Sequence, residues 1–178
     1  MPTVTQWAAS SRARVVVGYF HWPLLANVEL ATKLLTAYGP DKWCEEMTIR
    51  WTGRNAKGAE KFKADDSLKV YADFFKQPHT LRSSNEDYAA GATTDVEAQE
   101  EDQKNGRKIK APLFLLYSKD YIGSGFDVPK EWKNWVDEGV EIESHALGDG
   151  IGHFGAEEAP EESARVIIAW LKARGFKT

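Results

Sequence analysis

The sequence contains very little cysteine. Cys44 is the only cysteine among 178 residues, so the chain cannot form an internal disulfide. A single thiol also cannot build a cysteine-based zinc cluster or a redox pair. This usage is typical of a reducing compartment, and we expect a cytoplasmic protein that needs no metal and no other cofactor.

Long hydrophobic runs and a dominant charge are missing as well. The longest apolar stretch, residues 15–26, is interrupted by His21 and Pro23 and is too short to span a bilayer. The 23 Lys and Arg residues nearly balance the 27 Asp and Glu residues, which leaves a formal net charge of -4. Because there is no basic stripe, the sequence predicts neither a nucleic-acid partner nor a membrane partner.

Strand patterns are absent from the first hundred residues. Apolar side chains instead recur at helical spacing within 27–38 and 66–76. The positions expected to face a core are Val28, Ala31, Leu35, Tyr38, Leu68, Tyr71, Phe74 and Phe75. A charged segment, 95–110, closes this part of the chain, and we expect residues 1–105 to form one helical region.

The pattern then changes. The apolar run 113–117 predicts a strand covered on both faces, and the alternation in 140–147 predicts a second strand. Helices are predicted for 129–139 and 161–175. The last helix is expected to turn Ala164, Ile167, Ile168 and Leu171 inward. This order predicts two parallel strands in an α/β layer over 106–178.

Two strands are too few for such a layer. A parallel strand that is buried on both faces needs neighbours to pair with its backbone, and sheets typically have about four to six strands. The rest of the sequence supplies none. We therefore expect either that another chain completes the sheet or that these residues are the rear part of a larger domain.

One histidine stands where α/β proteins place their chemistry. His153 lies in "GDGIGHFGAEEAPEES" (148–163), among glycines that follow the second predicted strand. It is a candidate base, and the alternative is a loop histidine that caps a carbonyl. The acids of this segment fit the dipole of the following helix and lack the interleaved spacing of a calcium loop. They are Glu157, Glu158, Glu161 and Glu162.

Three segments of the chain, in order, resemble a known family. They are "GYFHWPLLAN" (18–27), "NEDYAAGATTD" (85–95) and "GHFGAEEAPEE" (152–162). With them the chain resembles the C-terminal part of the α/β-hydrolase fold, and most closely the haloacetate (fluoroacetate) dehalogenases, neighbours of the epoxide hydrolases. The resemblance implies a partial α/β-hydrolase fold. A helical cap over 1–105 would precede the last two parallel strands and helices of the core over 106–178, with the N-terminal half of the sheet missing.

The resemblance also implies a role for each candidate residue. His153 would activate the water that hydrolyses an aspartyl ester. His21, Trp22 and Tyr88 would donate hydrogen bonds to the leaving halide, and Trp51 would form an aromatic wall at the entrance. Neutral donors suit this chemistry, because the developing anion must be stabilised in a dry pocket. The implied partner is a small haloacid or an epoxide, and the family suggests a homodimer.

Two parts of the family's machinery are missing from the sequence. There is no Gly-x-Asp-x-Gly elbow for the nucleophile and no arginine pair after it, so we expect both upstream of Met1. The acid that orients His153 is expected upstream or in the turn after the first predicted strand. In that turn Asp120 is close, Tyr121 stands at the expected position, and Asp127 is a more distant option.

Three functions stay open at this point. The first is a dehalogenase of short haloacids, and the second is an epoxide hydrolase. Epoxide hydrolases generally use two cap tyrosines, and Tyr88 has no obvious second partner in the sequence, which favours the dehalogenase. The third is a truncated module that has no catalytic activity by itself.

Overall fold

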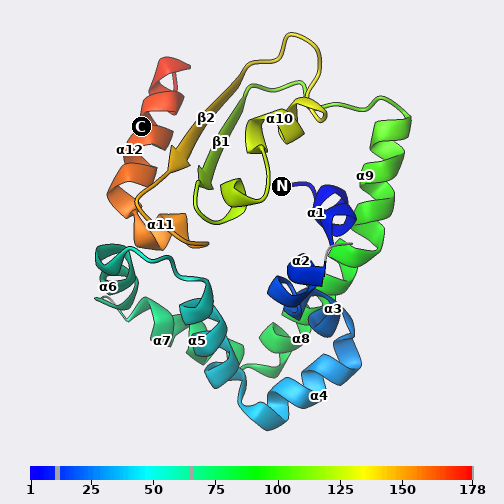
Figure 1. Ribbon diagram of the computed structural model, residues 1–178, viewed down its shortest axis with the longest axis vertical. Coiled ribbons are helices and arrows are strands. Elements are labelled where there is room, and N and C mark those ends of the chain that lie inside the picture. Colours follow the sequence, from blue (N-terminus) through cyan, green and yellow to red (C-terminus); the bar gives the residue numbers. More distant parts are fainter. Residues whose placement is uncertain (11–12, 65, 178) are drawn as a thin grey trace. The chain divides into compact units, whose positions relative to one another are not determined.

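The computed structural model describes residues 1–10, 13–64 and 66–177 (Figure 1). These residues form two compact units. The N-terminal unit consists of Met1–Glu46 with Lys69–Lys108, and the C-terminal unit consists of Met47–Leu68 with the chain from Ile109 onward. Residues 47–68 therefore pack with the C-terminal part, although they lie within the predicted cap. The division of cap and core at residue 105 stays a prediction.

Helices fill the described part of the first hundred residues, as expected. They are α1 (Thr3–Ala9), α2 (Ala13–Gly18), α3 (His21–Ala26), α4 (Val28–Tyr38), α5 (Pro40–Trp51), α6 (Ala56–Ala64), α7 (Ser67–Phe75), α8 (Pro78–Ala92) and α9 (Thr94–Lys104). Breakers separate several of them: Gly39, with a positive φ of 108°, ends α4, and Pro78 begins α8.

The N-terminal unit has its own apolar core. Its buried members are Leu25, Ala31, Leu35 and Leu81, against which Trp43, Phe75 and Tyr88 pack. Helix α8 lies against both α3 and α4. Three residues expected to face a core, Tyr38, Tyr71 and Phe74, are exposed instead, and Ala72 takes the buried position in α7. The apolar arc of 66–76 is wide, so its periodicity could not decide which edge of the arc faces inward.

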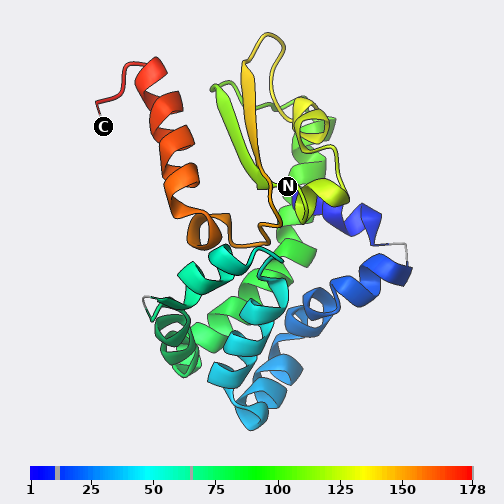
Figure 2. The same cartoon turned by 60° about the vertical axis from the view of Figure 1, so that its left-hand side comes forward.

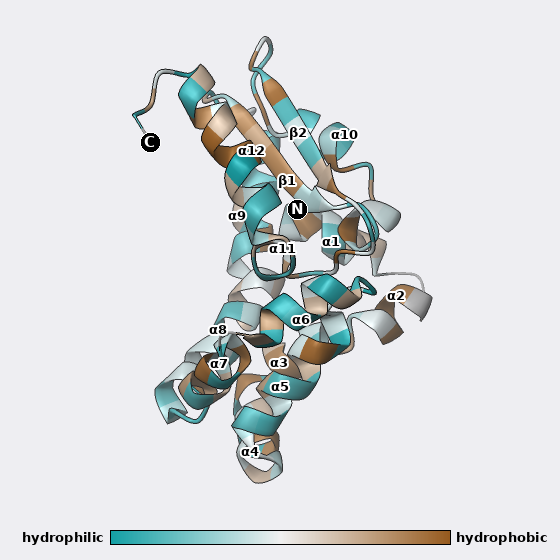
Figure 3. Ribbon diagram, turned by 90° about the vertical axis from the view of Figure 1, so that its left-hand side faces the viewer, coloured by the Kyte–Doolittle hydropathy of each residue, from teal (hydrophilic) through white to brown (hydrophobic). Residues whose placement is uncertain are grey.

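The C-terminal unit is built on two strands, β1 (Leu113–Ser118) and β2 (Ile142–Leu147). They pair in parallel, with Leu113 opposite Ile142 and Ser118 opposite Leu147, which confirms the predicted arrangement. The strands run side by side in Figures 1 and 2. Figure 3 shows β1 hydrophobic along most of its length, whereas β2 is more hydrophilic. Within the described residues this is a two-stranded sheet, so each strand has one edge without a pairing neighbour.

The remaining elements connect and follow the strands. They are the 3-10 turn η1 (Ile122–Ser124), α10 (Val128–Lys133), α11 (Gly155–Glu158) and α12 (Pro160–Ala173). The helix predicted over 129–139 ends early, at Lys133. The Ile109 N–H donates to the Trp135 carbonyl at 2.9 Å, and the Asp137 N–H donates to the Ile109 carbonyl at 2.9 Å. A strand-like bridge to Ile109 therefore takes the backbone that the last helical turn would need.

The residues that α12 buries differ from those expected from the sequence. Ala164, Ile167 and Ile168 of α12 are exposed and Leu171 is half-buried, whereas Ser163 is buried. The reason is the size of the sheet: two strands offer too little surface to cover a wide apolar face on a 14-residue helix. The narrow sheet likewise leaves most of β1 only half-buried rather than covered on both faces.

Candidate active site

His153 lies in the loop between β2 and α11, within the C-terminal unit. Its backbone N–H donates to the carbonyl of Trp51, the last residue of α5, at 3.0 Å. Three aromatic rings surround the imidazole, with centroids at 4.9 Å for Tyr121, 5.0 Å for Phe154 and 6.2 Å for Trp51. The residue as a whole is exposed, so the rings cover the imidazole only in part. The fold thus brings the predicted base next to the predicted aromatic wall.

The surroundings of His153 favour its neutral form. Removal of water by the neighbouring protein atoms lowers its pKa below the ordinary value of 6.5, and the negative charge of Glu158 opposes this only in part. A neutral imidazole at pH 7 has a ring nitrogen free to accept a proton. His153 is therefore in the state that a general base requires.

This state can be measured on the 178-residue chain. We expect an NMR titration of the His153 ring protons to show a midpoint below 6.5. Because the unfolded chain then binds a proton more readily than the folded chain, the free energy of unfolding should decrease as the pH falls through 6.5 towards the folded-state pKa. A midpoint at or above 6.5 would contradict the assignment of His153 as a preformed base.

Glu158 has a structural role that its place in the sequence did not indicate. Its side chain is only 2% exposed, and its carboxylate accepts three backbone hydrogen bonds. Oε2 accepts from the N–H of Gly53 at 2.7 Å and of Gly152 at 2.9 Å, while Oε1 accepts from Phe154 at 3.1 Å. Glu158 lies in the first turn of the short helix α11 and not at the start of α12, and its carboxylate also binds backbone outside that helix. Glu161 and Glu162 do lie in the first turn of α12.

The two segments that Glu158 joins approach each other backbone to backbone. A Cβ atom on Gly152 would come closer than 3.0 Å to the Trp51 carbonyl oxygen and to two backbone atoms of Gly53. A Cβ atom on Gly53 would meet the backbone of 150–152 just as closely. Only glycine at both positions allows this contact, which holds the end of α5 against the histidine loop.

The acids proposed to orient His153 are bonded elsewhere. The Asp120 carboxylate accepts from the Gly150 N–H at 2.9 Å, and Asp127 caps α10 by accepting from the Lys130 N–H at 3.1 Å. Neither acid hydrogen-bonds to His153 in the part of the chain that the structure describes. Instead the Tyr121 ring, from the turn after β1, lies against the imidazole with an interplanar angle of 55°. Asp120 as the orienting acid stays a prediction.

Ser118, which the sequence did not single out, positions this turn. The residue is buried at the end of β1, and its hydroxyl donates to the Ile151 carbonyl at 2.6 Å. The same oxygen accepts from the Tyr121 N–H at 3.0 Å. One side chain therefore links the turn that carries Tyr121 to the loop that carries His153. A serine that ends an apolar run was the only signal for it.

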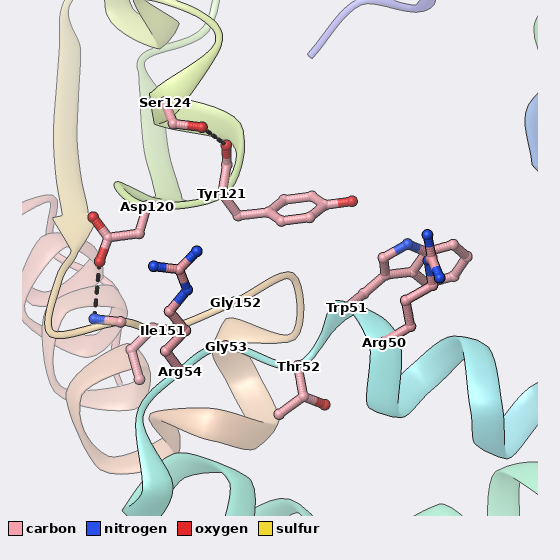
Figure 4. Close-up of a pocket in the computed structure, with 11 residues that line it drawn as sticks. Arg50, Trp51, Thr52, Gly53, Arg54, Asp120, Tyr121, Ser124, Ile151 and Gly152 are labelled. Atoms are coloured by element: carbon pink, nitrogen blue, oxygen red, sulfur yellow. Dashed lines mark hydrogen bonds between the residues drawn. The ribbon is translucent and has the colours of Figure 1, made fainter. Parts of the chain in front are cut away.

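A pocket of about 520 Å³ opens beside this loop (Figure 4). Its wall comes from the end of α5 and the segment after it, the turn after β1, and Gly150 to Gly152. Arg50 and Arg54 contribute two positive charges, and Asp120 contributes the one carboxylate. Arg54 and Tyr121 point into the pocket in Figure 4. The pocket suits a small ligand that carries a negative charge.

The three predicted halide donors lie together in the N-terminal unit. The His21 ring centroid is 5.7 Å from that of Tyr88 and 6.4 Å from that of Trp22, and the Trp22 and Tyr88 centroids are 6.4 Å apart. His21 is only 4% exposed. Burial, and secondarily the charge of Asp87, raises the pKa of Tyr88, which keeps its hydroxyl a neutral donor.

Tyr19 is a fourth member that sequence reasoning passed over. Its ring centroid is 5.5 Å from that of Trp22 and 6.3 Å from that of His21. Burial raises the pKa of Tyr19 as well. The residue stands two positions before His21 in the segment that carried the family resemblance, so the signal was present. Tyr19 and Tyr88 thus both lie beside Trp22.

Other sites are not apparent among the described residues. No group of three or more His, Cys, Asp and Glu side chains there could hold a metal ion. His145 of β2 pairs with Glu162 at 2.7 Å, and His79 lies exposed in α8. Nor does any helix in the described ranges have the length and apolar character needed to cross a membrane.

Comparison with solved structures identifies the fold. One match is a protein from Nostoc sp PCC 7120 that is described as an α/β hydrolase. It has a TM-score of 0.80 and 29% identity, and the match covers 96% of this chain and 54% of the Nostoc chain. A Pseudomonas aeruginosa protein assigned as an epoxide hydrolase matches with a TM-score of 0.80 and 26% identity, over 97% of this chain and 54% of its own. The chain therefore has the fold of a C-terminal part of an α/β hydrolase.

Comparison with the sequences of curated proteins gives a more specific relative than the fold does. The chain is a homologue of fluoroacetate dehalogenase from Burkholderia sp, to which it is 25% identical over 158 residues. These residues are 88% of this chain and 48% of the relative. No family model matches the sequence. The chain thus spans about half the length of the proteins it resembles.

Proposed function

We propose that this chain supplies the cap and the base of a hydrolase that opens the carbon–halogen bond of a short haloacid. The observation that carries the proposal is the cluster of His21, Trp22 and Tyr88, where ring N–H and O–H donors gather at a half-buried to buried position. The relative named fluoroacetate dehalogenase supports the same reaction. We also place the protein in the cytoplasm and expect a homodimer.

The reaction has two steps. An aspartate oxygen, from the half that this chain lacks, attacks the carbon that bears the halogen. The carbon–halogen bond breaks, and the halide leaves with the electron pair. His153 then takes a proton from water, and the resulting hydroxide adds to the ester carbonyl carbon. Collapse of the intermediate breaks the bond to the alkoxide, which takes a proton from the His153 imidazolium and leaves as the hydroxyacid, and the aspartic acid then loses its proton to restore the carboxylate.

Epoxide hydrolysis is the second candidate, and Tyr19 is the observation that favours it. Two tyrosines, Tyr19 and Tyr88, both lie beside Trp22, and a pair of cap tyrosines is what epoxide hydrolases generally use. The pocket next to His153 favours the haloacid, because Arg50 and Arg54 outnumber the single carboxylate of Asp120. A haloacid carries a negative charge and an epoxide does not, so we rank the haloacid first.

The test joins this chain to a segment that carries the Gly-x-Asp-x-Gly elbow, taken from the Burkholderia relative. We expect the completed protein to release fluoride from fluoroacetate and the 178-residue chain alone to release none. Trp22→Phe should reduce the release, because it removes an N–H donor, whereas Tyr19→Phe should leave it nearly unchanged. Diol formation from an epoxide without fluoride release, lost in Tyr19→Phe, would establish the second candidate instead. Activity of the chain alone would overturn the assumption of a missing nucleophile.

A further inference from the structure

We propose that Glu158 is the positioning residue of the histidine loop. Its buried carboxylate holds this loop against the end of α5 and thereby fixes the imidazole of His153 beside the ring of Trp51. The inference rests on the proposed function only in taking His153 as the base. The bonds that carry it are the three backbone hydrogen bonds from Gly53, Gly152 and Phe154.

A carboxylate is the group that this arrangement requires. A charge that is 98% removed from solvent must be compensated by donors, and three N–H groups aimed at two oxygens provide that compensation. Glutamine has the same length but offers one acceptor oxygen and two N–H donors. In Glu158→Gln, at least one backbone N–H would face another donor, so the three bonds cannot all form.

One of the three bonds crosses a long sequence separation, and the other two lie within the loop. Gly53 is 105 residues from Glu158, and Gly152 and Phe154 flank His153 on both sides. The His153 N–H reaches the Trp51 carbonyl between these bonds. With both neighbours of His153 held, the backbone that carries the imidazole has little freedom to turn away from Trp51. The carboxylate therefore acts on the base through the loop.

The charges around the loop are few. Glu158 is the carboxylate whose field acts on the imidazole of His153. Arg50, Arg54 and Asp120 line the adjacent pocket. Substitution of Glu158 by a neutral residue removes a charge that favours imidazolium, so it should lower the titration midpoint of His153 further. The midpoint thus reports the charge of Glu158, and the contact between the His153 and Trp51 rings reports its positioning of the loop.

The test compares Glu158→Gln with Glu157→Gln in the 178-residue chain. Both remove one negative charge from α11, but Glu157 lies beside Ser67 and makes none of the three backbone bonds. In Glu158→Gln we expect hydrogen exchange at Gly53, Gly152 and Phe154 to be about tenfold faster or more. The nuclear Overhauser contact between the His153 and Trp51 rings should weaken, and the His153 midpoint should fall. Glu158→Asp should restore these properties in part, and Glu157→Gln should leave them unchanged.

A folded Glu158→Gln chain with an unaltered His153–Trp51 contact and an unaltered midpoint would overturn the proposal. If the variant does not fold, the unmodified chain decides. The amide protons of Gly53, Gly152 and Phe154 should exchange with solvent at similar slow rates, because one buried carboxylate holds all three. Fast exchange at any of the three would overturn the proposal. None of these readouts involves hydrolysis, so absence of dehalogenase activity would leave the positioning result intact.

Discussion

Gly152→Ala is expected to lower the free energy of unfolding by about 3 kcal/mol or more, the effect of forcing atoms into closely packed backbone. The new Cβ would come within 3.0 Å of the Trp51 carbonyl oxygen and of Gly53 backbone atoms. None of these neighbours is the flexible end of a side chain. The loop and the end of α5 must separate, which also stretches the Glu158 bonds to Gly53 and Gly152.

Gly148→Ala is the matched control from the same loop. A Cβ on Gly148 would meet nothing within 4 Å, and its φ is not in the left-handed region. We expect its free energy of unfolding to stay within about 0.5 kcal/mol of the unmodified chain. Urea denaturation followed by tryptophan fluorescence measures both variants. Equal stability of the two alanine variants would show that the backbone contact between Gly53 and Gly152 is not formed.

His153→Gln in the completed protein is expected to stop turnover after the first step. The aspartate can still displace the halide, so about one equivalent of fluoride should be released per active chain. Without a base to activate water, the ester should persist, and steady-state fluoride release should fall about 1,000-fold. A fluoride electrode follows the release, and mass spectrometry of the intact protein detects the trapped ester.

His145→Gln is the control for this experiment. His145 lies on β2 and pairs with Glu162, away from any role in the proposed reaction. We expect its fluoride release to match that of the unmodified protein. Full steady-state activity in His153→Gln would remove His153 from the reaction, and loss of even the first equivalent of fluoride would show that the residue acts before the ester forms.

The candidate site was only partly predictable from the sequence. The motif segments contain His21, Trp22, Tyr88 and His153, and the family resemblance added Trp51. The structure places the first three residues together and His153 beside Trp51. These residues come from separate segments, so the family resemblance, and not their spacing along the chain, associated them. The roles assigned to these residues stay proposals, since they depend on a substrate and a nucleophile from outside the chain.

The residues that were missed act across the chain. Glu158 looked like one acid among several, because its meaning depends on Gly53, 105 residues away. Ser118 looked like the end of a strand, yet it joins the Tyr121 turn to Ile151. Tyr121 was noted only as standing where an acid was expected, and its ring lies 4.9 Å from that of His153. Sequence spacing cannot reveal a partner that only the fold brings near.

The sequence by itself determined the helices of the first hundred residues, the two parallel strands and the similarity to α/β hydrolases, because hydrophobic periodicity and short motifs are local properties. The tertiary structure alone decided which faces are covered: α12 leaves Ile167 and Ile168 exposed, and α7 buries Ala72 rather than Phe74. It also decided how His153 is held, through a buried carboxylate and two glycines in contact. Burial and backbone hydrogen bonds depend on what lies opposite in space, which no single segment of a chain contains.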